Sequence, residues 1–141
     1  MKFSDIIVCD DIRNEMGGKH TLVGVYADKI VFNTGHNESP WPLPKQLGIY
    51  VRLIKEEDDP EFTGFNMKIF LELSKESQPS QLINVDGVFK GSLSNPVILN
   101  FVVPVNFPGP GPLKLKLNFA TKDNGIVGLS SDLLEVTSRP K

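Results

Sequence analysis

Apolar and polar residues alternate along most of this sequence, and that period of two limits the folds open to the chain. Over 113–119, leucine or phenylalanine fills every odd position, with Lys114 and Lys116 between them, and similar alternation runs through 47–53 and 67–73. Successive side chains of a β-strand point to opposite faces of a sheet, so this pattern is typical of half-buried strands. No stretch has the apolar spacing of a long amphipathic helix. The sequence therefore predicts an all-β fold.

Turn-forming residues divide the chain into about eight or nine short runs with strand character. Asp123-Asn124-Gly125, for example, supplies the positive-φ residues that a tight hairpin turn needs. Such a pattern is typical of a sandwich or a barrel. Of these two folds we expect a two-layer antiparallel β-sandwich of the immunoglobulin-like kind, with little helix. We expect one domain spanning 1–141. The expected strands cover 6–9, 21–26, 29–32, 47–53, 67–73, 81–90, 97–103, 113–119 and 126–136.

The charge balance argues against nucleic acid as a partner. The chain has 15 Lys and Arg against 17 Asp and Glu, a net charge of -2, with both signs scattered. Phosphate binding needs clustered Lys and Arg. No apolar run reaches the length of a secretory signal or a membrane helix, so we expect no membrane association and a cytoplasmic location. Cys9, the single cysteine, lies in an apolar run that is typical of a buried, unreactive thiol.

An acidic cluster flanks the first expected turn. Asp10, Asp11 and Glu15 are candidate calcium ligands, because calcium takes several carboxylate and carbonyl oxygens. Arg13 and Lys19 stand among them, however, and a metal site would not favour cations inside it. The alternative is a structural corner in which those two cations pair with the carboxylates and an aspartate caps the turn. We favour the corner and predict no bound metal.

No catalytic constellation is visible. The two histidines, His20 and His36, lie next to no recognisable nucleophile motif, and no phosphate-binding loop has the required glycine spacing. Asp10 and Asp11 are adjacent, so on a strand they would point to opposite faces and could not act as a catalytic pair. We therefore predict that the protein is not an enzyme and needs no cofactor.

Candidate partner-binding residues lie in the proline-rich segments and on the cleanest strand. Trp41 sits between prolines, which would hold it rigidly for recognition, although a large aromatic there can also plug one end of a sandwich. Phe107 begins a proline- and glycine-rich loop that is either a recognition loop or a stiff crossover between strands. Lys114 and Lys116 form either a docking face or a guard against aggregation at a sheet edge.

The first 26 residues carry a resemblance to a known family. Cys9-Asp10-Asp11-Ile12-Arg13 followed by Glu15, then Gly18-Lys19, then Gly24-Val25-Tyr26, resembles the opening of an uncharacterised family of small bacterial proteins, a domain of unknown function with a C-D-D-x-R-x-E start. The resemblance implies a compact β-sandwich and a bacterial source. It implies no activity.

These observations favour a non-catalytic protein-binding or accessory module of a bacterial cell, because small sandwiches display loops for recognition and no reactive group stands out. The partner would be another protein. One alternative is a structural homo-oligomer that assembles through sheet edges or through an apolar outer face containing Tyr50, Ile54 and Phe70. A second alternative is a calcium-binding β-sandwich at the acidic cluster.

Overall fold

The computed structural model describes residues 1–35, 40–73 and 78–139, so His36 lies outside the described residues. No helix occurs within these ranges, which confirms the all-β prediction. In particular, they contain no helix long and apolar enough to cross a membrane. The ten strands are β1 (Lys2–Cys9), β2 (Asp11–Asn14), β3 (His20–Val23), β4 (Lys29–Asn33), β5 (Leu43–Ile54), β6 (Phe62–Leu71), β7 (Ser80–Val88), β8 (Val97–Phe107), β9 (Gly111–Thr121) and β10 (Ile126–Arg139).

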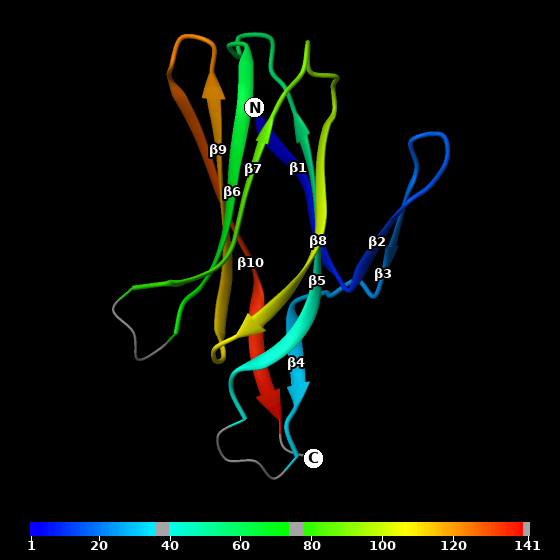
Figure 1. Cartoon of the computed structure of the whole chain (residues 1–141), viewed down its shortest axis with the longest axis vertical. Coiled ribbons are helices and arrows are strands. Elements are labelled where there is room, and N and C mark those ends of the chain that lie inside the picture. The colour runs from blue at the N-terminus through cyan, green and yellow to red at the C-terminus, as the bar shows by residue number, and fades with distance from the viewer. Residues whose placement is uncertain (36–39, 74–77, 140–141) are drawn as a thin grey trace.

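The strands form two larger sheets and one hairpin. The three-stranded sheet has the order β1-β5-β8, the five-stranded sheet has the order β4-β10-β9-β6-β7, and β2 pairs only with β3. Figure 1 shows the two larger sheets extending along the long axis, with the β2–β3 hairpin projecting from the body.

One pairing departs from the expected antiparallel arrangement. β4 runs parallel to β10, with Ile30 opposite Val136, whereas the other described ladders are antiparallel. Parallel neighbours need a long connection between them, and residues 34–125 separate these two strands. Local turn signals cannot reveal such a distant pairing.

A single hydrophobic core is shared by the two larger sheets. On β5 and β9 the alternate positions read from the sequence are buried, and each of these side chains is at most 1% exposed. Full burial of such a side chain stabilises the fold by roughly 1.5–3 kcal/mol, so these two strands contribute much of the driving force. The buried residues of the two strands are Leu47, Ile49, Val51, Leu53, Leu113, Leu115, Leu117 and Phe119.

The structure has one strand more than the nine expected from the sequence, and the additional strand is β2. At Asp10 the chain leaves β1, and the Asp10 amide donates to the carbonyl oxygens of Val23 at 2.9 Å and Gly24 at 3.1 Å. The following residues then pair with β3 instead of continuing beside β5. Residues 11–14 lack an apolar alternation, so no local pattern marked them as a strand.

The predicted turn at 123–125 is confirmed. Asn124 has a φ of 66°, the left-handed conformation that asparagine tolerates. The Thr121 hydroxyl oxygen accepts a hydrogen bond from the Gly125 amide at 2.8 Å and its hydroxyl donates to Asp123 Oδ1 at 2.6 Å. This turn joins β9 to β10 and holds Lys122 at one end of the molecule.

Candidate functional site

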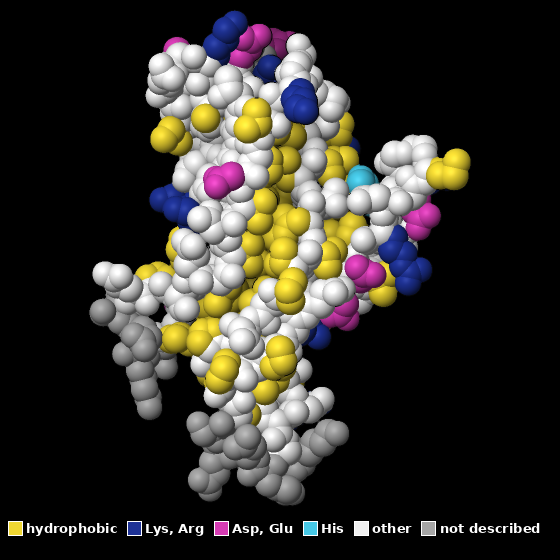
Figure 2. All heavy atoms as spheres, viewed as in Figure 1, with side chains coloured by type: hydrophobic (Ala, Val, Ile, Leu, Met, Phe, Trp, Pro, Cys, Tyr) yellow, Lys and Arg dark blue, Asp and Glu magenta, His cyan; other side chains and the backbone are white. Residues whose placement is uncertain are grey.

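A pocket of about 360 Å³ lies where three connections meet at one end of the sheets. They are the links from β5 to β6, from β7 to β8 and from β9 to β10. In Figure 1 this is the upper end, which also carries the N-terminus, and Figure 2 shows charged side chains of both signs gathered there. Volumes of this size fall at the lower end of the range for small-molecule sites.

Aromatic rings form the apolar part of this end pocket. Phe62 is buried, Phe89 and Leu93 are half-buried, and all three line the space. The rings belong to a larger aromatic group, since the Phe119 ring lies 5.2 Å from Phe62 and 6.2 Å from Phe89, centre to centre. Phe65 packs on the other side of Phe89 at 5.5 Å. Because neighbouring rings fix Phe89, the apolar wall is formed before any ligand arrives.

Polar groups form the rim. Lys122 Nζ and Glu61 Oε2 make an ion pair at 3.2 Å, and their backbones are also joined by a hydrogen bond from the Lys122 amide to the Glu61 carbonyl at 3.0 Å. Thr63 and Ser92 add hydroxyl groups beside the apolar wall. An apolar wall of rings combined with a few polar groups is the arrangement that orients small amphiphilic molecules in a site.

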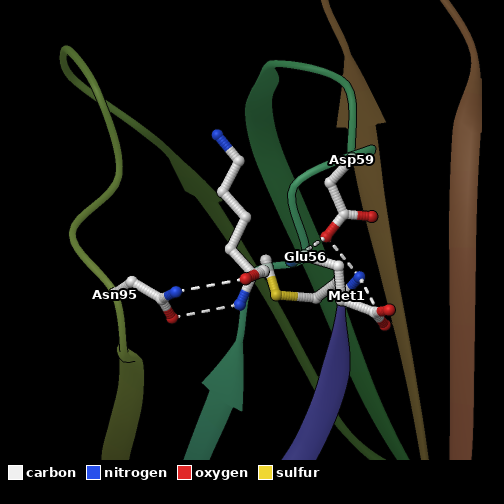
Figure 3. A network of polar contacts seen from close by, with 5 residues as sticks. Met1, Glu56, Asp59 and Asn95 are labelled. Carbon is white, nitrogen blue, oxygen red and sulfur yellow. Dashed lines mark hydrogen bonds and ion pairs between the residues drawn. The ribbon is translucent and has the colours of Figure 1, made fainter.

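Lys55 is held at this rim through its backbone. The Asn95 side-chain amide donates to the Lys55 carbonyl, and the Lys55 amide donates to Asn95 Oδ1, both at 3.1 Å (Figure 3). This pair of bonds ties the β7–β8 connection to the end of β5. The half-buried Lys55 therefore lines the pocket from a fixed attachment point.

Next to Lys55, a second cation is already neutralised. The α-amino group of Met1 pairs with Asp59, whose side chain is 12% exposed, and with Glu56 Oε1 at 3.5 Å. Asp59 Oδ2 also accepts the Glu56 amide at 2.7 Å, as Figure 3 shows. Burial alone would raise the pKa of Asp59, but its hydrogen bonds and the nearby positive charges outweigh burial and lower the pKa.

The predicted acidic corner has a different structure from the expected one. Tyr26 donates its hydroxyl to Asp10 Oδ1, and Lys45 Nζ lies 3.3 Å from the same oxygen and 5.4 Å from the centre of the Tyr26 ring. Arg13 and Lys19, the expected cations, form no ion pair in the part of the chain that the structure describes. The counter-charge comes instead from β5, which adjacency in the sequence could not show.

The other two acids of the corner serve local turns. Asp11 Oδ1 accepts the Ile12 amide at 3.0 Å, and Glu15 Oε1 accepts the Thr21 hydroxyl at 3.3 Å. Asp10, Asp11 and Glu15 therefore do not converge on a common point. Within the described ranges, no group of three or more His, Cys, Asp or Glu side chains is placed to hold a metal ion.

Close packing explains several residues of the opening motif. Gly24 has a φ of 68°, and a Cβ there would collide with the Asp10 carboxylate. Burial and the hydrogen bond to Asp10 raise the pKa of Tyr26, while Lys45 acts against them. Cys9 is confirmed as a buried thiol, because it is 0% exposed. Burial raises its pKa foremost, a backbone hydrogen bond at Asp11 lowers it, and the charges of Asp10 and Asp11 raise it further.

The proposed partner-binding aromatics pack inward. Phe107 is 0% exposed and contacts Phe32 with ring centres 5.5 Å apart, so its side chain belongs to the core. Trp41 is half-buried and meets the same Phe32 ring edge-on at 5.4 Å. Both aromatics thus close the end of the molecule opposite the pocket.

The two lysines of β9 lie in the middle of a sheet. β9 is flanked by β10 and β6, so Lys114 and Lys116 cannot guard a sheet edge. Lys114 Nζ makes ion pairs with Glu72 at 3.1 Å and Asp132 at 3.7 Å, and the Glu72 pair raises its pKa foremost. Lys116 is exposed.

Sequence reasoning missed Lys55, Phe89 and Lys122. Residues 55–60 form a charged run without a site motif, and 89–93 have no motif either. The pocket exists because three connections far apart in the chain meet at one end. The one local signal was the turn at 123–125, which places Lys122 but says nothing about its neighbours.

Comparison with known proteins gave few matches. No family model matches the chain, and no curated protein matches it, so the family resemblance of the N-terminal motif stays a prediction. Two solved structures that resemble it are both superoxide reductases (neelaredoxins) from Ignicoccus hospitalis. One is 14% identical, with a TM-score of 0.42, over 79% of this chain and 75% of that one. The other is 12% identical, with a TM-score of 0.42, over 93% and 82%.

These matches contradict the prediction of a non-catalytic protein-binding or accessory module. Both matched chains are named as superoxide reductases. We therefore withdraw that prediction. A TM-score of 0.42 gives no ground for assigning the reductase activity to this chain.

Proposed function

We propose that this protein binds a small aromatic molecule in the end pocket. The observation that carries the proposal is the half-buried Phe89 ring, which lines a space of about 360 Å³ and is held in place by two neighbouring rings. An aromatic ligand gains most from such a wall, because rings prefer offset or edge-on contacts with other rings. The contact adds about 0.5–1.5 kcal/mol to the free energy gained by burying apolar area.

Preorganisation supports the same proposal. Asn95 fixes the end of β5, the β9–β10 turn fixes Lys122, and the Phe62 ring is buried beneath the pocket. A site whose walls are already ordered loses less conformational entropy when the ligand binds. The pocket therefore suits a small ligand that could not order flexible loops by itself.

We also propose that the two larger sheets form a two-layer sandwich of the immunoglobulin-like kind. Support comes from the shared core between β5 and β9 and from strands that alternate buried and less buried residues. Connections between strands cluster at the ends of such sandwiches, and those loops commonly bind ligands. The end pocket has that location.

A blocking variant tests the binding proposal. Ser92 lines the pocket, so Ser92→Trp would fill the space, whereas Ser94→Trp places the same side chain in the same connection at a residue that does not line it. Ligand-observed NMR with benzyl alcohol and with benzoate should detect binding to the wild type and to S94W, and lose it in S92W. Absence of binding of both probes to the wild type, or unchanged binding by S92W, would overturn the proposal.

A further inference from the structure

The charges around the end pocket do not cancel. Three charged side chains line it, and two of them, Lys122 and Glu61, neutralise each other at 3.2 Å. The third is Lys55, whose ammonium group makes no ion pair with any described residue. The lining therefore carries one uncompensated positive charge.

Nearby acids do not remove that charge. Of the carboxylates in the same connection, Asp59 and Glu56 already face the α-amino group of Met1, and Glu61 pairs with Lys122. The other two, Glu57 and Asp58, are exposed and do not line the pocket. Lys55 contributes to the low pKa of Asp59 only through its charge, which is the last and smallest of the causes acting there. Lys55 thus stays available to an anion that enters the pocket.

We infer that the ligand of this pocket is a monoanionic aromatic compound of the aryl carboxylate class, with its ring on Phe89 and its carboxylate at Lys55. This inference rests on the proposed function and adds the charge of the ligand to it. One surplus positive charge matches one negative charge. A dianionic aryl phosphate would bring a second charge that only the Glu61-paired Lys122 could meet.

The ring and the charge are recognised by different parts of the pocket. Phe62, Phe89 and Leu93 supply apolar surface, while Lys55 contributes a charged side chain to the lining. A charged hydrogen bond at a half-exposed rim is expected to favour benzoate over neutral benzyl alcohol by about five- to tenfold in Kd. Salt should weaken benzoate binding and leave benzyl alcohol unaffected, because screening acts only on the charged ligand.

The experiment compares benzoate, benzyl alcohol and phenyl phosphate by NMR titration of the wild type, of Lys55→Met and of a charge-neutral control. Lys55→Met keeps a long side chain and the backbone bonds to Asn95, so it should reduce benzoate binding to the level of benzyl alcohol without changing the latter. The control, Glu61→Gln with Lys122→Gln, removes one charge of each sign and should keep the preference for benzoate.

The outcomes separate the two proposals. Benzyl alcohol bound as tightly as benzoate by the wild type would overturn the inference about charge and leave the proposed aromatic site standing. Phenyl phosphate bound more tightly than benzoate would also overturn the monoanion inference. Loss of all three probes would instead contradict the proposed function itself. Measuring how salt changes the Kd of benzoate and of benzyl alcohol for the wild type tests the inference about charge without any variant.

Discussion

The corner around Asp10 and the pocket at the end of the sheets contain similar side chains arranged with opposite results. At the corner, the Asp10 carboxylate accepts a hydrogen bond from Tyr26 and forms an ion pair with Lys45, which compensates its negative charge. At the pocket, Lys55 has a fixed backbone and no ion pair among the described residues. A polar group that has its partners within the protein stabilises the fold. A polar group without such a partner, beside an apolar space, can instead bind a polar group of a ligand.

The pocket end also contains a saturated cation, and removing its partner should produce the largest effect. Asp59→Asn leaves the α-amino group of Met1 without its nearest carboxylate. We expect a loss of about 3 kcal/mol in the free energy of unfolding, because the ammonium group loses a charge-assisted hydrogen bond. Urea denaturation at pH 7 measures it, and Asp58→Asn, an exposed neighbour outside the network, should be close to neutral.

The same pair predicts a pH dependence. Since folding lowers the pKa of Asp59 below its ordinary 3.8, its contribution is complete above pH 3.8 and is lost as the pH falls through the lower folded value. The stability difference between wild type and D59N should hold from pH 7 down to about 4 and shrink only below. A difference that already disappears at pH 6 would contradict this assignment.

At the corner, the close approach of Gly24 to Asp10 should account for the next largest effect. Gly24→Ala imposes a positive φ on alanine and pushes its Cβ into the Asp10 carboxylate. We expect a loss of about 2–3 kcal/mol, combining backbone strain with a disturbed hydrogen bond. Gly17→Ala is the matched control, since Gly17 has a φ of 78° but nothing within 4 Å of its added Cβ. Equal losses in both variants would refute a specific contact with Asp10.

The smallest effect is expected for Tyr26→Phe, which removes only the hydroxyl that donates to Asp10. Lys45 remains beside the carboxylate, so the loss should be about 1 kcal/mol at pH 7. Because folding raises the pKa of Tyr26 above 10.0, its contribution persists below pH 10 and is lost above it. Thermal unfolding of wild type and variant at pH 7 and above pH 10 measures the stability loss and its pH dependence, with Tyr50→Phe as the control. A loss that is the same at both pH values would contradict the role of the Tyr26 hydroxyl as the donor to Asp10.

Local patterns in the sequence predicted the strands well and the sites poorly. The alternation at 47–53 and 113–119 identified the buried faces of β5 and β9, because strand geometry depends on neighbouring residues. The parallel pairing of β4 with β10 and the contact of Lys45 with Asp10 join residues far apart in the chain. No local pattern encodes such contacts. From the sequence, Arg13 and Lys19 were therefore predicted as the cations of the corner, and the end pocket was not predicted.

A chemical-shift map of the ¹⁵N-labelled protein during a benzoate titration tests the contrast between the two regions most directly. We predict saturable shifts for the amides of Thr63, Gly91 and Ser92 at the pocket, with those of Gly24 and Tyr26 at the corner unchanged. Shifts confined to the corner, or none at the pocket at saturating benzoate, would contradict the claim that the end with the unpaired lysine is where this protein binds its ligand.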